Sequence, residues 1–80
     1  MELEILSPDK KIYSGKIKLV KLPGSLGSFG VLENHAPLIS TLESGQIKVI
    51  DVNNDIQTFD VDEGVVEVLK NRIIVLVGSV

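Results

Sequence analysis

The segment from Leu22 to Gly45, LPGSLGSFGVLENHAPLISTLESG, gathers most of the residues in this chain that could do chemistry. It holds four glycines, several hydroxyl side chains and the only histidine, His35. Such a segment could cradle a phosphate, carry a catalytic serine and histidine, or present a shaped edge to a partner protein. Each of these roles demands a different spacing of residues.

The glycine spacing does not fit a phosphate site. Gly24, Gly27 and Gly30 lie three residues apart. A dinucleotide-binding fingerprint requires G-x-G-x-x-G at the start of a helix, and a P-loop requires a lysine after its last glycine. No helical pattern follows this segment that could turn an N-terminus toward an anion. The glycines therefore indicate tight turns and close backbone approach.

The evidence for a catalytic site in this segment is unspecific, because serine, histidine and acidic residues occur in most sequences. His35 could act as a general base for a serine, with Glu33 orienting the imidazole. The candidate nucleophiles are Ser28, Ser40 and Ser44. The proline two residues after His35 holds the residue before it extended, so His-Ala-Pro is typical of a rigid corner that braces the backbone or meets a partner. We expect no catalytic residue here and favour a docking surface on a rigid scaffold.

Composition narrows the function further. The 80 residues suffice for one domain, 1–80, and carry no cysteine and a net charge of −3. We therefore expect no disulfide and no cofactor or metal, although carboxylates could hold a hard cation. The negative charge and the few aromatic residues argue against nucleic acid as a partner. No leader or membrane-spanning run is recognisable, which predicts a soluble, cytoplasmic chain that meets a membrane only through a partner.

Alternation of apolar and polar residues predicts strands and no long helix. Within 16–22 the alternation changes phase, because Ile17 and Leu19 share one parity and Val20 and Leu22 the other, which indicates a β-bulge. Asn71 favours a tight hairpin between the last two strands. About eight or nine short strands predict an all-β sandwich or barrel. The segments are 2–6, 11–15, 16–22, 45–51, 56–61, 65–69 and 72–77, with further short pieces between 22 and 45.

Five apolar residues on either side of the His-Ala-Pro corner are expected to pack against the core and hold this segment in place. They are Phe29, Val31, Leu32, Leu38 and Ile39.

The run LPGSLGSFGVLENHAPLISTLESGQIKV resembles the signature segment of the epsilon subunit of rotary F-type ATP synthases. LEILSPDKKIYSG is similar to the opening of that family, and FDVDEGVVEVLKNRIIVLVG is similar to its closing hairpin. The resemblance covers essentially the whole chain. It implies a ten-stranded β-sandwich of two packed sheets.

The resemblance also implies a function. It describes a non-catalytic rotor subunit of the central stalk, which binds the gamma subunit and the c-ring of the proton-translocating ATP synthase and couples rotation to ATP synthesis. Such a subunit lies peripherally at the cytoplasmic face of the bacterial inner membrane. Carried over by position, the gamma-facing residues are Ser7, His35 and Ser40. Those facing the c-ring are Gly27, Ser28 and Phe29.

Two departures from the family pattern bear on these expectations. Ser28 stands where the family usually has an acid, so Glu33 is expected to supply the charge that contacts the c-ring. The sequence ends at Val80, without the helical hairpin that in the family inhibits ATP hydrolysis and in some members binds ATP. The resemblance therefore implies neither inhibition nor ATP binding here.

Two other classes of function stay open on the sequence. One is a stand-alone β-sandwich module that binds a protein, peptide or glycan. The other is a small hydrolase that uses His35 and a serine.

Overall fold

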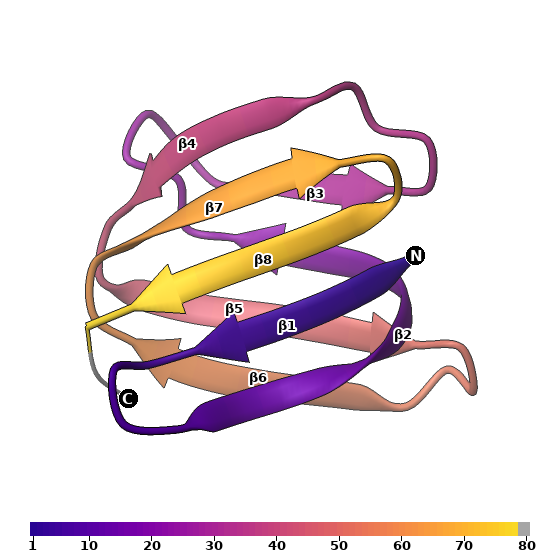
Figure 1. The fold of residues 1–80 in the computed structure, drawn as a ribbon, viewed down its shortest axis with the longest axis horizontal. Helices are drawn as coiled ribbons and strands as arrows, with labels where there is room; N and C mark the ends of the chain where they lie inside the picture. The colour runs from indigo at the N-terminus through magenta and orange to yellow at the C-terminus, as the bar shows by residue number, and fades with distance from the viewer. Residues whose placement is uncertain (79–80) are drawn as a thin grey trace.

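The computed structural model describes residues 1–78, which form eight strands and contain no helix (Figure 1). The expected domain of residues 1–80 thus extends beyond the described part at 79–80. In chain order the strands are β1 (Glu2–Leu6), β2 (Lys11–Leu22), β3 (Phe29–Leu32), β4 (Leu38–Leu42), β5 (Gly45–Asp51), β6 (Ile56–Val61), β7 (Gly64–Leu69) and β8 (Arg72–Val77). Residues 1–78 accordingly offer no helix that could cross a membrane.

The strands form one hydrogen-bonded sheet that curls over on itself. Its order is β4-β7-β8-β1-β2-β5-β6, and β3 pairs with β2 beside this path. Strand β2 joins the two halves, because its first part pairs with β1 and its second part with β3 and β5. In Figure 1, β4, β7, β8 and β1 lie in front, with β3 and β5 behind them. Only β1 and β8 pair in parallel.

This architecture is all-β, as expected, and differs from the expected one in strand number. The described residues form eight strands, where ten were expected, and the two halves of the sheet are joined through β2. One physical reason lies at Gly24, which makes only an isolated bridge to Leu42. Backbone bonds from Ser25 N to Thr41 O (3.1 Å) and from Glu43 N to Pro23 O (2.9 Å) flank this bridge. A contact this short joins two edges without forming a further strand.

The core lies between the two halves of the sheet and draws on both. Where β2 passes from β1 to β5, its register shifts between Ile17 and Leu19. The shift leaves Ile17 and Val20 both buried, at 2% and 0% exposure, so the predicted bulge is confirmed. The core residues are Leu3, Ile5, Ile17, Val20, Leu22, Val31, Leu42, Ile47, Val49, Val61, Val66, Val68, Ile73, Val75 and Val77.

The predicted hairpin at Asn71 is confirmed. Lys70 (φ 51°) and Asn71 (φ 61°) both adopt the left-handed conformation in the turn between β7 and β8. Two successive residues with positive φ produce the backbone twist that a two-residue hairpin requires.

Two of the five residues expected to pin the corner to the core do not do so. Val31 is fully buried, and Phe29 and Leu38 pack against the core from its margin. Leu32 and Ile39 are 61% and 76% exposed. Side chains alternate between the two faces of a strand, so the neighbour of a buried residue points outward whatever its hydrophobicity.

Candidate partner-binding surfaces

The glycine loop, residues 23–28, connects β2 to β3 and is tied to the end of β4. Besides the backbone bonds at Ser25 and Glu43, the Thr41 hydroxyl donates to Ser25 Oγ at 2.9 Å, and Gly27 N donates to Gly24 O at 3.0 Å. Gly24 is required sterically. A Cβ there would lie 2.6 Å from Gly27 O and 2.7 Å from Phe29 Cε1. The loop is therefore a shaped edge with little freedom to rearrange.

Leu26 forms the exposed tip of the glycine loop and was missed by sequence reasoning. It is the most exposed of the large hydrophobic residues, at 106% of the reference value, and Ser25, Gly27 and Ser28 around it are uncharged. The sequence did contain a clue to its exposure. Leu26 stands between serines and glycines, outside any segment with the alternating pattern of a strand, so no strand face is available to bury it. A fully exposed leucine on a constrained turn suits contact with another protein.

The His35 corner, residues 33–37, lies at the opposite end of β3 from the glycine loop. His35 N donates to Leu32 O at 3.2 Å, and the imidazole Nδ1 lies 2.7 Å from Ala36 O, where a protonated Nδ1 donates to that carbonyl. The side chain is half-buried. The corner is therefore braced by its own backbone while one side of the imidazole ring remains accessible.

An asparagine pair fixes this corner to the β7–β8 hairpin. Asn34 N donates to Asn71 Oδ1 at 2.6 Å, and Asn71 Nδ2 donates to Asn34 Oδ1 at 3.2 Å. The carbonyl of Asn71 also accepts a bond from Glu2 N at 2.9 Å. Asn71 thus joins the corner, the hairpin and the start of β1. Both asparagines have positive φ, which asparagine tolerates better than most residues.

The structure separates the residues expected to face the c-ring. Gly27, Ser28 and Phe29 adjoin one another at the glycine loop. Glu33 follows Leu32 at the far end of β3. Since strand residues rise ~3.3 Å each, Glu33 lies more than about 10 Å from Ser28. Contact at the tip of the glycine loop would therefore involve Ser28 without Glu33, and the role expected for Glu33 stays a prediction.

Two of the three residues expected to face gamma, Ser7 and His35, lie at the ends of one surface, here called the front face. Ser7 lies in the β1–β2 turn, where its amide donates to Lys10 O at 2.9 Å, and His35 lies at the opposite end of the molecule. Ser40 lies between these ends in β4, but it pairs with the fully buried Val66, so its side chain points to the core side of the sheet and not outward. The front face is the outer surface of β1, β8, β7 and β4 (Figure 1).

Aliphatic side chains cover much of the front face. In one row across the strands, Leu6 faces Leu76, Leu76 faces Val65, and Val65 faces Thr41. Beside the His35 corner a shallow groove is lined by Pro37, Leu38, Ile39, Glu67, Val68 and Leu69. The exposed hydrophobic residues of this face are Ile39 (76%), Leu76 (49%), Leu69 (48%) and Val65 (41%).

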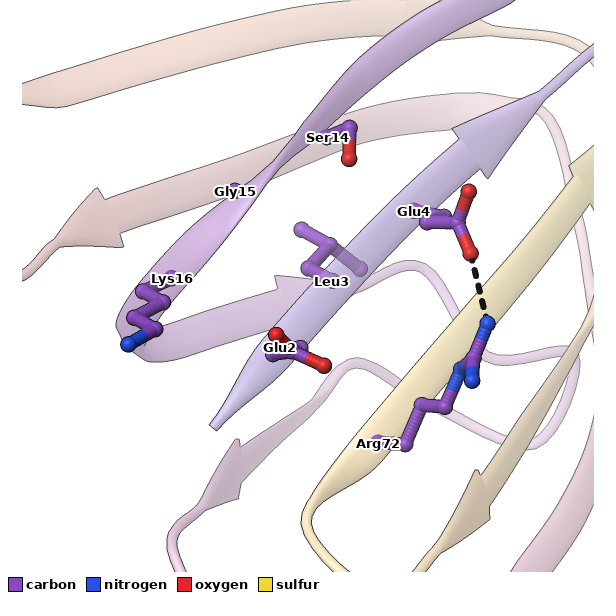
Figure 2. Close-up of a pocket in the computed structure, with 7 residues that line it drawn as sticks. All are labelled: Glu2, Leu3, Glu4, Ser14, Gly15, Lys16 and Arg72. Carbon is purple, nitrogen blue, oxygen red and sulfur yellow. Dashed lines mark hydrogen bonds and ion pairs between the residues drawn. The ribbon is translucent and has the colours of Figure 1, made fainter.

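A hollow on the β1 side of the front face carries charged groups that compensate one another. Figure 2 shows the Arg72 guanidinium reaching Glu4, at 3.0 Å, and Lys11 lies 3.5 Å from the same carboxylate. The hydrogen bond from Arg72, together with Lys11, holds the pKa of Glu4 below its ordinary value. The hollow is lined by Glu2, Leu3, Glu4, Ser14, Gly15, Lys16 and Arg72. This arrangement is a surface ion-pair network.

The geometry does not assemble a Ser–His pair within residues 1–78. Ser28 and Ser44 lie at the end opposite His35, and the Ser40 hydroxyl donates to Thr41 O at 3.2 Å. Over the same residues no cluster of three or more potential metal ligands occurs. What the described surface offers is shape and apolar area.

Comparison with known proteins identifies the family. The model of the "ATP synthase, Delta/Epsilon chain, beta-sandwich domain" family matches residues 1–80. The chain belongs to this family. Among curated relatives, the ATP synthase epsilon chain of Campylobacter fetus is 42% identical over 79 residues, which are 99% of this chain and 61% of the relative. That of Sulfurimonas denitrificans is 43% identical over 77 residues, which are 96% of this chain and 59% of the relative.

The chain thus spans about three-fifths of the length of these epsilon chains. Among solved structures, a Euglena gracilis mitochondrial ATP synthase containing OSCP, F1 and the c-ring has a chain that matches with a TM-score of 0.88 at 17% identity. That match covers 94% of this chain and 48% of the other. The central stalk and c-ring of the Tetrahymena thermophila mitochondrial enzyme give 0.82 at 18%, covering 98% and 63%. At these identities the matches establish the epsilon-type fold.

Proposed function

We propose that this chain is a rotor subunit of the central stalk of an F-type ATP synthase, which binds the gamma subunit and the c-ring and couples rotation to ATP synthesis. It adds no bond chemistry of its own. It lies at the cytoplasmic face of a bacterial inner membrane and is held there indirectly through the c-ring. Membership in the delta/epsilon family and the ATP synthase assemblies among the structural matches support this proposal.

The gamma subunit binds the front face. The observation that carries this assignment is the exposed aliphatic surface between Ser7 and His35, with Ile39 76% exposed in its groove. Interface energy concentrates in a few well-buried anchors surrounded by contacts that exclude water. Ile39 and Leu69, on either side of the groove, are such anchors.

The c-ring contacts the glycine loop. Because Ser28 is neutral and Glu33 lies at the other end of β3, this contact is made by Leu26 and the serine hydroxyls rather than by an ion pair. The constrained backbone around Gly24 keeps the leucine presented before binding, which reduces the entropy lost on association. The close-packed interior then transmits torque between the two partners with little shear.

Co-expression with the cognate gamma subunit tests the front face. The wild-type chain should co-purify with gamma, and Ile39→Glu should weaken the complex at least tenfold because it replaces the most exposed aliphatic side chain of the groove with a second carboxylate directly opposite Glu67. Ile56→Glu is the matched control, since Ile56 is exposed to a similar degree on the opposite surface. Loss of gamma binding in both variants, or in neither, would contradict the assignment of this face.

His35→Ala separates two roles of the corner. If the imidazole contacts gamma, the variant binds gamma more weakly at an unchanged Tm. If it only braces the corner, Tm falls and the affinity of the folded protein is retained. Both quantities are measured on the same purified variant.

Docking on the isolated c-ring tests the loop. Leu26→Asp should weaken binding of the gamma complex to the ring several-fold, whereas Glu33→Gln and Ser28→Ala should have little effect. If Glu33→Gln weakened binding more than Leu26→Asp, the result would support the charged contact expected from the sequence and refute the apolar contact.

A further inference from the structure

A second surface, on the side opposite the front face, is used by neither proposed contact. This rear face is the outer surface of β3, β2, β5 and β6. We propose that it docks an acidic amphipathic helix of a third partner protein. The proposal rests on two adjacent rows of side chains that differ in chemistry.

The first row is apolar and crosses all four strands. Leu32 pairs with Leu19, Leu19 pairs with Ile50, and Ile50 pairs with Ile56. The end members, Leu32 and Ile56, are 61% and 58% exposed, and the middle two are half-buried. Their neighbours along the strands are core residues such as Val20, Val31 and Val49, so the row points away from the core. A continuous aliphatic row on a solvated face suits contact with another apolar surface.

The second row is basic and lies two residues further along each strand. Lys21 stands directly opposite Lys48, with Gly30 beyond Lys21 and Thr58 beyond Lys48. Like charges that face each other across a strand pair are destabilising. Neither lysine forms an ion pair with a side chain of residues 1–78. Asp60 lies on the same face, diagonal to Lys48, but it bonds to Gln46 and forms no ion pair with either lysine, so a partner's carboxylates would remove the remaining repulsion.

The dimensions of the two rows fit a helix lying across the strands. Neighbouring strands are ~4.8 Å apart, so the apolar row is ~14 Å long. At 1.5 Å per residue this corresponds to roughly nine or ten residues of α-helix. Acidic residues at i and i+3 or i+4 lie ~5–6 Å apart, which matches the spacing of the two lysines. The apolar stripe of such a helix covers the first row while its acidic flank lies over the second.

Photo-crosslinking in the assembled enzyme tests this inference. With p-benzoylphenylalanine at Ile56, illumination of native membranes should attach the chain to one protein whose cross-linked peptide is helical and has two acidic residues one turn apart beside an aliphatic stripe. Lys21→Glu/Lys48→Glu should reduce the yield at least tenfold, and Lys21→Arg/Lys48→Arg should retain it. Lys10→Glu/Lys16→Glu is the control for a general change of charge.

Four outcomes would overturn the inference: no cross-link, a cross-link to lipid only, a cross-linked peptide without acidic residues, or a yield unaffected by charge reversal at Lys21 and Lys48. The experiment assumes that the chain is assembled in the enzyme, but its readout is separate from gamma binding. Gamma binding by the Lys21→Glu/Lys48→Glu variant should be unchanged, which also shows that it is folded. Failure of the wild-type chain to bind gamma would refute the gamma assignment and leave the rear-face result standing.

Discussion

The front and rear faces both carry aliphatic rows on the outside of the same curled sheet, but they differ in how their charged side chains are paired. On the front face, Glu4 is flanked by Arg72 and Lys11, so opposite charges compensate one another. On the rear face, Lys21 faces Lys48 and no described acidic side chain pairs with either. The Glu4 network is satisfied internally, whereas Glu67 in the groove forms no ion pair with the described residues, so the front face offers mainly apolar area to a partner. A face that leaves like charges opposed is stabilised by a charged partner.

The largest expected difference is between Gly64, in the half of the sheet that carries the front face, and Gly30, in the half that carries the rear face. The two positions should differ in how well they tolerate an added methyl group. A Cβ on Gly64 in β7 would overlap the carbonyl oxygen of Leu76, which is backbone and cannot move aside. Gly64→Ala should therefore destabilise the fold by about 2 kcal/mol or more and lower Tm by roughly 10 °C or more. Gly30→Ala in β3 is the comparison, because the nearest atom to its Cβ would be Leu19 Cδ1, at 3.3 Å, the end of a side chain that can move. Equal losses of Tm in the two variants would contradict this difference between the layers.

The hydrogen-bonded pair of Asn34 and Asn71 should contribute more to stability and to gamma binding than its exposed position suggests. Asn71→Ala removes both side-chain bonds to Asn34 and leaves alanine in a left-handed conformation, which together should cost about 1–2 kcal/mol. Thermal unfolding measures this loss, and gamma affinity should fall about fivefold as the His35 corner loses its anchor. Lys70→Asn, in the same turn, should raise Tm slightly and leave gamma affinity unchanged. Unchanged gamma affinity in folded Asn71→Ala would show that the pair serves stability alone.

The opposed lysines should make the isolated chain less stable than it would be without them. Lys48→Thr removes the repulsion from Lys21 and should raise stability by about 0.5 kcal/mol at low ionic strength. The gain should shrink at high salt, because screening weakens the repulsion in the wild-type chain. Lys10→Thr, in the β1–β2 turn, is the control and should change little. A destabilised Lys48→Thr variant would argue against an electrostatic penalty on the rear face.

The smallest expected effect concerns the ion-pair network of the front face. The folded state lowers the pKa of Glu4, so its contribution is present above the carboxyl's ordinary pKa and is lost as the pH falls through the lowered value. Glu4→Gln should lower Tm at pH 7 by about 2 °C or less, because the network is exposed to solvent. The difference from wild type should vanish in acid. A difference that persists at pH 2 would assign the effect to packing instead of charge.

Several features of the fold could be predicted because they depend on neighbours in the chain. The bulge in β2 was visible as a phase change between Ile17 and Val20, and the final hairpin was visible at Asn71. The exposure of Leu32 and Ile39 was not predicted, since hydrophobicity alone favours burial and only the strand register decides which face a side chain takes. Leu26 was overlooked for a related reason. A leucine in a turn is indistinguishable by type from a leucine in a strand.

The site residues named from the sequence stay predictions, and the sequence did not show how they are arranged into surfaces. The His-Ala-Pro corner and the glycine spacing indicated docking rather than catalysis. That Glu33 and Ser28 lie at opposite ends of β3, and that Asn34 pairs with Asn71 across 37 positions of sequence, follows only from the folded chain. Contacts of this kind join segments whose separation in sequence carries no information about their distance in space.

The order of residues along the chain therefore determined the strand segments, the turns and the family to which the chain belongs, since alternation, turn residues and a signature motif are local properties. Tertiary structure alone decided which side chains form the front and rear faces. Those faces are built from rows that run across strands, and the register of hydrogen bonding between distant segments places each residue in its row.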